Sequence, residues 1–175
     1  AIGDSALISN TTASNNVAIS YAALNVNTTG ANNVAIGYTA LAANTTASNN
    51  IAIGGYAMDA NTTGANNTAM GHAALGVNTT GANNVAVGYN TLDASTTAGD
   101  NTAVGKEALT ACTTGGGNTC IGYRTGVLLT SGGNNTAVGF VAMGNGTVTG
   151  ATNTAVGYAA LYSLTSGTDN LALGR

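Results

Sequence analysis

The chain has 175 residues and a net charge of −3, and 5% of its residues are charged, about a fifth of the share usual in soluble globular domains. Its apolar content of 44% is too high for a typical disordered chain. Three Lys or Arg residues in total give no electrostatic footprint for nucleic acid or an anionic membrane. No apolar run approaches the roughly 18 residues that span a bilayer, so we expect no membrane insertion of this segment.

One short motif, Ala-x-Gly, recurs from Ala1 to Ala172. Successive copies are 17 residues apart, except for one interval of 18 between Ala137 and Ala155. A repeat of fixed period indicates a stacked array, and the sequence shows no second domain. We therefore interpret residues 1–175 as a single repeat array. Because the chain begins and ends inside the motif, we expect the array to be a segment of a longer fibre.

Each repeat predicts one short strand. The segment from Val34 to Ile36 places β-branched residues on both sides of an Ala, and the Gly and Asn-Thr-Thr turn signals of each unit exclude a helical stripe. Seventeen residues at about 3.3 Å each give a contour of about 56 Å, the length of one turn of a narrow β-solenoid. The sequence thus predicts an all-β fold, a parallel β-solenoid (β-roll) of about ten 17-residue coils.

Equivalent residues of successive coils form columns, and each column has one structural role. The residue after the Ala, Ile36 in a typical coil, is a large aliphatic in every coil, so we expect this column to be the interior. A second interior column is predicted at Leu41 and its equivalents, with a gap at Gly126. The Ala column, in which Cys120 replaces one Ala, should then face outwards. Its small size predicts the close approach of sister chains.

Two polar columns have no exceptions, and they predict ladders that hold the corners of the coil. One is the Asn two residues before each Ala, and the other is a Thr in the following turn. We interpret both as structural columns without reactive residues. The Asn ladder comprises Asn16, Asn33, Asn50, Asn67, Asn84, Asn101, Asn118, Asn135, Asn153 and Asn170, and the Thr ladder comprises Thr11, Thr28, Thr45, Thr62, Thr79, Thr96, Thr113, Thr130, Thr147 and Thr165.

Charged residues occur singly along the array. A charge in the consensus would stack against itself at about 4.8 Å in every coil, at a cost of about 1 kcal/mol per contact even in water. Glu107 is followed one coil later by Arg124. We predict that these two residues form a stacked, exposed ion pair of small energetic worth.

Residues suited to catalysis or metal binding are scarce. The only histidine, His72, lies in a column otherwise held mainly by aromatic residues, which favours a surface or interface ring. Gly115–Gly117 lacks the Lys of a phosphate loop. Cys112 and Cys120 are about half a coil apart, so we expect two independent thiols at opposite ends of the roll. We expect no enzyme, no catalytic or metal-binding residue and no cofactor.

The motif Asn-x-Ala-(Ile/Val)-Gly, as at Asn33 to Gly37, resembles the head repeats of YadA-type trimeric autotransporter adhesins. The segment Asn153 to Leu161 is even more similar to the Asn-Thr-Ala-Val-Gly-Tyr-x-Ala-Leu repeats of phage tail-fibre-like proteins. The resemblance covers the whole chain and implies a left-handed β-roll packed as a homotrimer. It carries over no binding residue, because the shared motif is structural, and the adhesin coil is shorter.

The leading functional hypothesis is a structural fibre shaft or adhesin head. Such a protein would be extracellular, would project from a cell surface or virion, would self-associate, and could attach to a cell-surface receptor or glycan. The alternative is an ice-binding solenoid that uses its Thr ladder, although Thr45 and Thr46 are adjacent and should point opposite ways. A hexapeptide-repeat acyltransferase is disfavoured by the 17-residue coil and by the lack of a catalytic His in a cleft.

Overall fold

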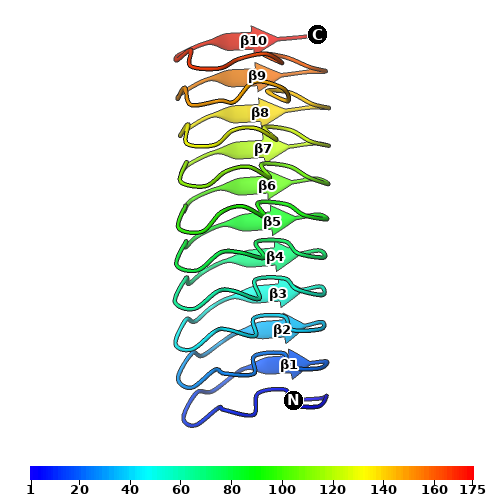
Figure 1. The fold of residues 1–175 in the computed structure, drawn as a ribbon, viewed down its shortest axis with the longest axis vertical. Helices are drawn as coiled ribbons and strands as arrows, with labels where there is room; N and C mark the ends of the chain where they lie inside the picture. Colours follow the sequence, from blue (N-terminus) through cyan, green and yellow to red (C-terminus); the bar gives the residue numbers. More distant parts are fainter.

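A computed structural model describes residues 1–175 and shows a rod of stacked coils with the two termini at opposite ends (Figure 1). Ten three-residue strands form one sheet in sequence order, and all neighbours are parallel. The predicted all-β parallel solenoid is confirmed. No helix in the chain is long and apolar enough to cross a membrane. The strands are β1 (Val17–Ile19), β2 (Val34–Ile36), β3 (Ile51–Ile53), β4 (Thr68–Met70), β5 (Val85–Val87), β6 (Thr102–Val104), β7 (Thr119–Ile121), β8 (Thr136–Val138), β9 (Thr154–Val156) and β10 (Leu171–Leu173).

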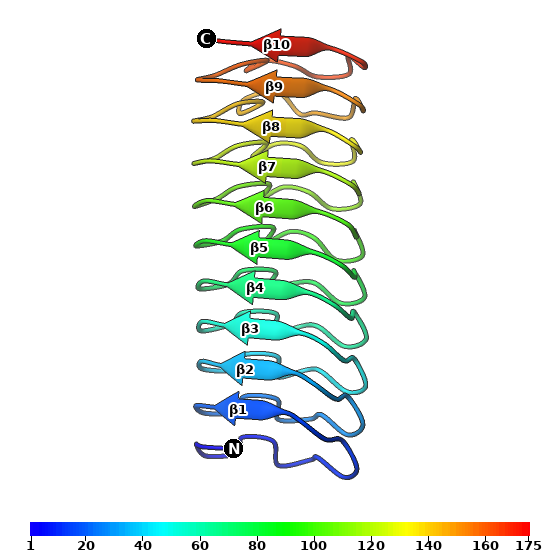
Figure 2. The same ribbon diagram turned by 180° about the vertical axis from the view of Figure 1, so that it is seen from behind.

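The strands stack in the register that the repeat predicts. Ala35 of β2 pairs with Ala52 of β3, one repeat later, and the single 18-residue interval joins Ala137 to Ala155 without a break in the sheet. The view from behind shows the same order of strands, with the turns completing each coil (Figure 2). Equivalent side chains therefore lie above one another along the rod.

The strand turns its Ala side chain inwards, which is opposite to the prediction. Ala35 is fully buried, whereas Ile36 is partly exposed and Ile53 keeps 37% of its surface exposed. The expectation of an interior Ile column and an outward Ala column is therefore wrong. The Ala residues are small because the opposite wall of the same coil lies close to the strand, and a close-packed interior leaves room there only for a methyl group.

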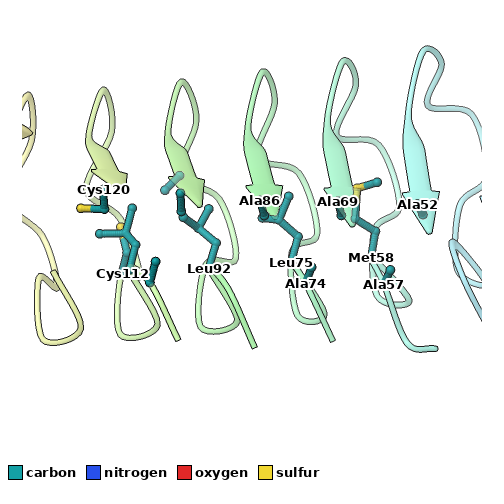
Figure 3. Close-up of a cluster of buried hydrophobic side chains, with 14 of the residues drawn as sticks. Ala52, Ala57, Met58, Ala69, Ala74, Leu75, Ala86, Leu92, Cys112 and Cys120 are labelled. Carbon is teal, nitrogen blue, oxygen red and sulfur yellow. The ribbon is translucent and has the colours of Figure 1, made fainter. Parts of the chain in front are cut away.

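The second predicted interior column is confirmed, and it supplies the large side chains of the core. Leu75 and Met58 are fully buried and pack in one cluster with the strand residues Ala69 and Ala86 (Figure 3). A second buried Ala column, which includes Ala74, lies one residue before the Leu column. The core is thus a thin layer of one large aliphatic and two small residues in a typical coil.

The gap in this column at Gly126 is filled by sulfur and by a neighbouring Leu. A Cβ on Gly126 would lie 2.7 Å from Cys120 Sγ, so the thiol occupies space that a Leu side chain takes in other coils. Leu129, three residues further on, is fully buried in the same core. The Cys that replaces Ala in β7 therefore compensates for the Gly that replaces Leu in the same coil.

Three residues of a typical coil adopt left-handed backbone conformations. In the coil of β2 they are Asn32 (φ 59°), Thr39 (φ 51°) and Leu41 (φ 52°). Each such residue costs about 1–2 kcal/mol when it is not Gly, less for Asn. The left-handed Asn is Asn32, the neighbour of the laddered Asn33. Burial of Leu41 holds its unfavourable backbone conformation in place.

Candidate functional site

The amide groups of the predicted Asn ladder are buried from Asn33 to Asn153 and stabilise the fold. Asn33 Oδ1 accepts the backbone N–H of Asn50 at 2.9 Å, and Asn33 Nδ2 donates to the carbonyl of Ala47 at 2.9 Å. Each side chain therefore joins its own coil to the next at two points. The same pattern repeats along the rod, for example at Asn118 with Asn135.

The Thr ladder also uses its hydroxyl groups between coils. Thr28 Oγ1 donates to the carbonyl of Thr45 at 3.0 Å, and Thr62 Oγ1 donates to that of Thr79 at 3.0 Å. The ladder does not include Thr147, because the extra residue of the 18-residue coil precedes it. The backbone N–H of Thr130 donates instead to the carbonyl of Val148.

A second, fully buried Asn ladder was not predicted from the sequence. Asn44 Nδ2 donates to Asn27 Oδ1 at 2.8 Å, and Asn78 Nδ2 donates to Asn61 Oδ1 at 2.8 Å. The Asn of each Asn-Thr-Thr triplet supplies it, although the triplet by itself predicts only a turn. The ladder ends at Ser95, where Asn78 Oδ1 and Ser95 Oγ are both buried without a hydrogen-bond partner.

Aromatic side chains form a continuous, exposed column on the rod, which we call the aromatic ladder. Neighbouring ring centroids are 5.1–5.5 Å apart, and the rings of Tyr21 and Tyr38 stack with an angle of 14° between their planes. His72 is a member, stacked 5.5 Å from Tyr89, so its predicted place in a ring column is confirmed. The rings belong to Tyr21, Tyr38, Tyr56, His72, Tyr89, Tyr123, Phe140 and Tyr158.

Two gaps in the ring column are filled in ways that the spacing does not predict. Gly55 holds the ring position of its coil, and Tyr56 from the next position contacts Tyr38 and His72 edge-on. Lys106 holds the ring position of a later coil, and its Nζ lies 5.8 Å and 5.9 Å from the ring centroids of Tyr89 and Tyr123. A cation thus bridges two rings through cation–π contacts, which keeps the column continuous.

The predicted ion pair is present beside this ladder. Arg124 Nε lies 3.4 Å from Glu107 Oε2, and Lys106 Nζ lies 3.5 Å from Glu107 Oε1. The cationic side chains are about half exposed, so each contact contributes about 0–1 kcal/mol. The contact agrees with the 17-residue register assigned from the sequence.

Two carboxyl groups lie partly buried two coils apart. Burial raises the pKa of Asp59 above 3.8, and the charge of Asp93 raises it further. Burial also raises the pKa of Asp93, while the charge of His72 acts in the opposite direction. Gly76 lies in the coil between them, and a Cβ on it would be 3.0 Å from Asp93 Oδ1. The Asp93 carboxyl group therefore lies next to Gly76, where a larger residue would contact it.

The two cysteines are free thiols in the core. Burial raises the pKa of Cys112 to about 11 and the pKa of Cys120 to about 12, and the charge of Cys112 adds to the second shift. The structure thus shows two separate thiols with no disulfide between them, as predicted. Both side chains enter the same thin interior, since each column around a narrow coil faces the others (Figure 3).

The outward residues of the strands form an uncharged surface, apolar at the third residue of every strand and either aliphatic or Thr at the first, which we call the outer strand face. It consists of the first and third residues of β1 to β10. Met70 and Ile121 are exposed, and Val87 and Val104 are partly exposed. The face runs through all ten strands, because every strand orients its Ala or Cys inwards.

Comparison with known proteins provides no relative for this chain. No protein-family model, no curated protein and no solved structure matches it.

Proposed function

We propose that the chain is a segment of an extracellular structural fibre shaft or adhesin head that projects from a cell surface or virion and assembles as a homotrimer. The outer strand face carries this proposal. A monomer leaves a large apolar side chain exposed or partly exposed to water in every coil, and Ile53, Met70 and Ile121 are among the exposed ones. Contiguous exposed apolar surface of this extent usually marks an interaction site.

The geometry of the outer strand face suits other copies of the same chain. Its side chains repeat once in every coil. A second rod that lies parallel to the first therefore has side chains at the same spacing, and the two faces can pack coil against coil. The face contains no charged residue, so its burial separates no charge from water. Identical surfaces favour closed symmetric assemblies. The number of three and the left-handed coil rest on the resemblance to trimeric adhesin heads.

The Ala column lies inside each coil and takes no part in the outer strand face. Ala35 and its equivalents contact the interior of their own chain, so sister chains are not needed to explain their size. Self-association is now supported by the exposed aliphatic side chains beside them.

The ice-binding alternative receives less support. The hydroxyl groups of Thr28, Thr45 and Thr62 donate to carbonyl groups of the next coil. Their protons are therefore not available for hydrogen bonds to an ice surface. Attachment to a receptor or glycan remains part of the proposal for the exposed columns of the rod. A thermal-hysteresis measurement that gives no effect at millimolar protein would end the ice-binding alternative.

Light scattering coupled to size-exclusion chromatography tests the assembly. We expect a mass three times that of the 16.8 kDa chain. Val87→Lys places a charge on the middle of the outer strand face and should give monomers, whereas Thr80→Lys, on the exposed turn that precedes β5, should keep the assembly. A mass of one chain at all concentrations, or an assembly that Val87→Lys does not affect, would overturn the proposal.

A further inference from the structure

We propose that Tyr21, Tyr38 and Tyr56 form a site of oxidative modification, where neighbouring phenol rings couple to dityrosine and staple successive coils together. The ring centroids of Tyr21 and Tyr38 are 5.3 Å apart, and those of Tyr38 and Tyr56 are also 5.3 Å apart. Each ring comes from a different coil. A bond between two of them would therefore close a covalent loop across the stack.

The site is accessible to an oxidant. Tyr21, Tyr38 and Tyr56 keep 49%, 47% and 42% of their surfaces exposed. Exposed side chains change rotamer within picoseconds to nanoseconds, so adjacent rings can rotate until their ortho carbons meet. Tyr21 and Tyr56 have the ring of Tyr38 between them, so their ortho carbons cannot meet.

Within the ladder, only these three tyrosines have a tyrosine neighbour to couple with. The other tyrosines of the ladder have no tyrosine neighbour: Tyr89 lies between His72 and Lys106. Tyr123 lies between Lys106 and Phe140. The last ladder tyrosine, Tyr158, stacks on Phe140 and lies beside Arg175. The ladder thus contains one group of adjacent tyrosines that can couple, and its three isolated tyrosines serve as internal controls.

The reaction balances with hydrogen peroxide as the oxidant, delivered through a haem peroxidase. Each of two phenol groups loses one electron and one proton, and the two phenoxyl radicals join through the carbons ortho to their oxygens. The hydrogen on each joined carbon then moves to its phenol oxygen, which restores the aromatic rings. One carbon–carbon bond forms, the chain loses two hydrogens, and one peroxide becomes two water molecules.

The test treats the dilute full chain with hydrogen peroxide and a haem peroxidase, then measures dityrosine fluorescence and peptide masses. Cleavage after Lys106 and Arg124 separates residues 1–106, 107–124 and 125–175. We expect the loss of two hydrogens in peptide 1–106. Additional cleavage before Asp4 and Asp59 should confine the loss to residues 4–58.

Matched variants locate the coupling. Tyr38→Phe keeps a ring in the ladder but leaves no two tyrosines adjacent, so it should abolish the fluorescence. Tyr123→Phe, in the same column, should leave the fluorescence unchanged. Phe140→Tyr should create a second coupling site, visible as crosslinks within residues 125–175 or between 107–124 and 125–175.

Three results would overturn the inference. They are fluorescence that survives Tyr38→Phe, coupling spread evenly over all tyrosines, and dityrosine found in covalent dimers in place of single chains. The inference does not depend on the proposed fibre function, because all contacts that carry it lie within one chain.

Discussion

Asn67 Oδ1 accepts two hydrogen bonds from the next coil, one from the backbone N–H of Asn84 at 2.9 Å and one from Asn84 Nδ2 at 3.2 Å. Asn84 continues the pattern, since its Oδ1 accepts the backbone N–H of Asn101 at 3.0 Å and its Nδ2 donates to the carbonyl of Ala98 at 2.9 Å. One fully buried amide thus connects three successive coils. This connection explains why the column contains only Asn.

Asn84→Ala should destabilise the chain by about 3 kcal/mol, because it leaves a buried N–H and a buried carbonyl without partners. The free energy of unfolding in urea, followed by circular dichroism, measures this loss. Asn83→Gly is the matched control, since Gly accepts the left-handed conformation of Asn83 (φ 61°) and the change removes only two exposed hydrogen bonds, one from Asn66 and one to Asp100. Equal losses in the two variants would contradict the assigned role of the ladder.

Ser95→Asn should stabilise the chain. The new Nδ2 group would reach Asn78 Oδ1, which lacks a donor, as Asn78 Nδ2 reaches Asn61 Oδ1 at 2.8 Å. Satisfying a buried acceptor should add about 1–2 kcal/mol to the free energy of unfolding. Ser95→Ala removes an unpartnered hydroxyl without extending the ladder and should change stability less. A lower urea midpoint for Ser95→Asn would show that the second ladder cannot continue into this coil.

The partly buried carboxyl groups should lower stability as the pH rises. Because the pKa values of Asp59 and Asp93 are raised in the folded chain, the unfolded chain releases their protons first as the pH passes 3.8. The folded state then binds more protons, so its stability is full below pH 3.8 and falls above it. The double variant Asp59→Asn, Asp93→Asn should exceed the natural chain in stability at neutral pH. This advantage should shrink below pH 3.8, and an advantage that does not depend on pH would exclude the proposed cause.

The Glu107–Arg124 contact should contribute little to stability. Glu107→Gln is expected to cost less than about 1 kcal/mol, because Arg124 is half exposed and its charge is screened. Arg124→Gln should give a similar change, and both effects should vanish in molar salt, where the Debye length is about 3 Å. Urea unfolding at two salt concentrations measures this. A large loss that persists in salt would indicate that Glu107 supports its left-handed backbone (φ 56°) in another way.

The 17-residue spacing predicts most of the aromatic ladder but not the place of Tyr56. The 17-residue spacing places Tyr21, Tyr38 and His72 in one column, and the structure stacks them in it. The same spacing assigns Tyr56 to the neighbouring column. Its ring nevertheless enters the ladder, because Gly55 leaves a ring-sized gap beside it. Spacing assigns backbone positions, whereas a long side chain takes the place that its neighbours leave free.

The sequence by itself determined the parallel solenoid, the position of each strand, the register and the Leu column of the core. These follow from a 17-residue period, since stacking places each residue against its equivalent, and the period fails only at Thr147 in the 18-residue coil, where Val148 faces Thr130. Only the tertiary structure decided which side of the strand faces inwards. The alternation of Ile36 with Ala35 defines two faces of the strand, but it does not indicate which of them is buried. The opposite wall of the coil, where Leu41 is buried, lies so close to the strand that a methyl group fits between them and a larger side chain does not. The larger aliphatic side chains therefore lie on the outside of the strand, where a partner can cover them.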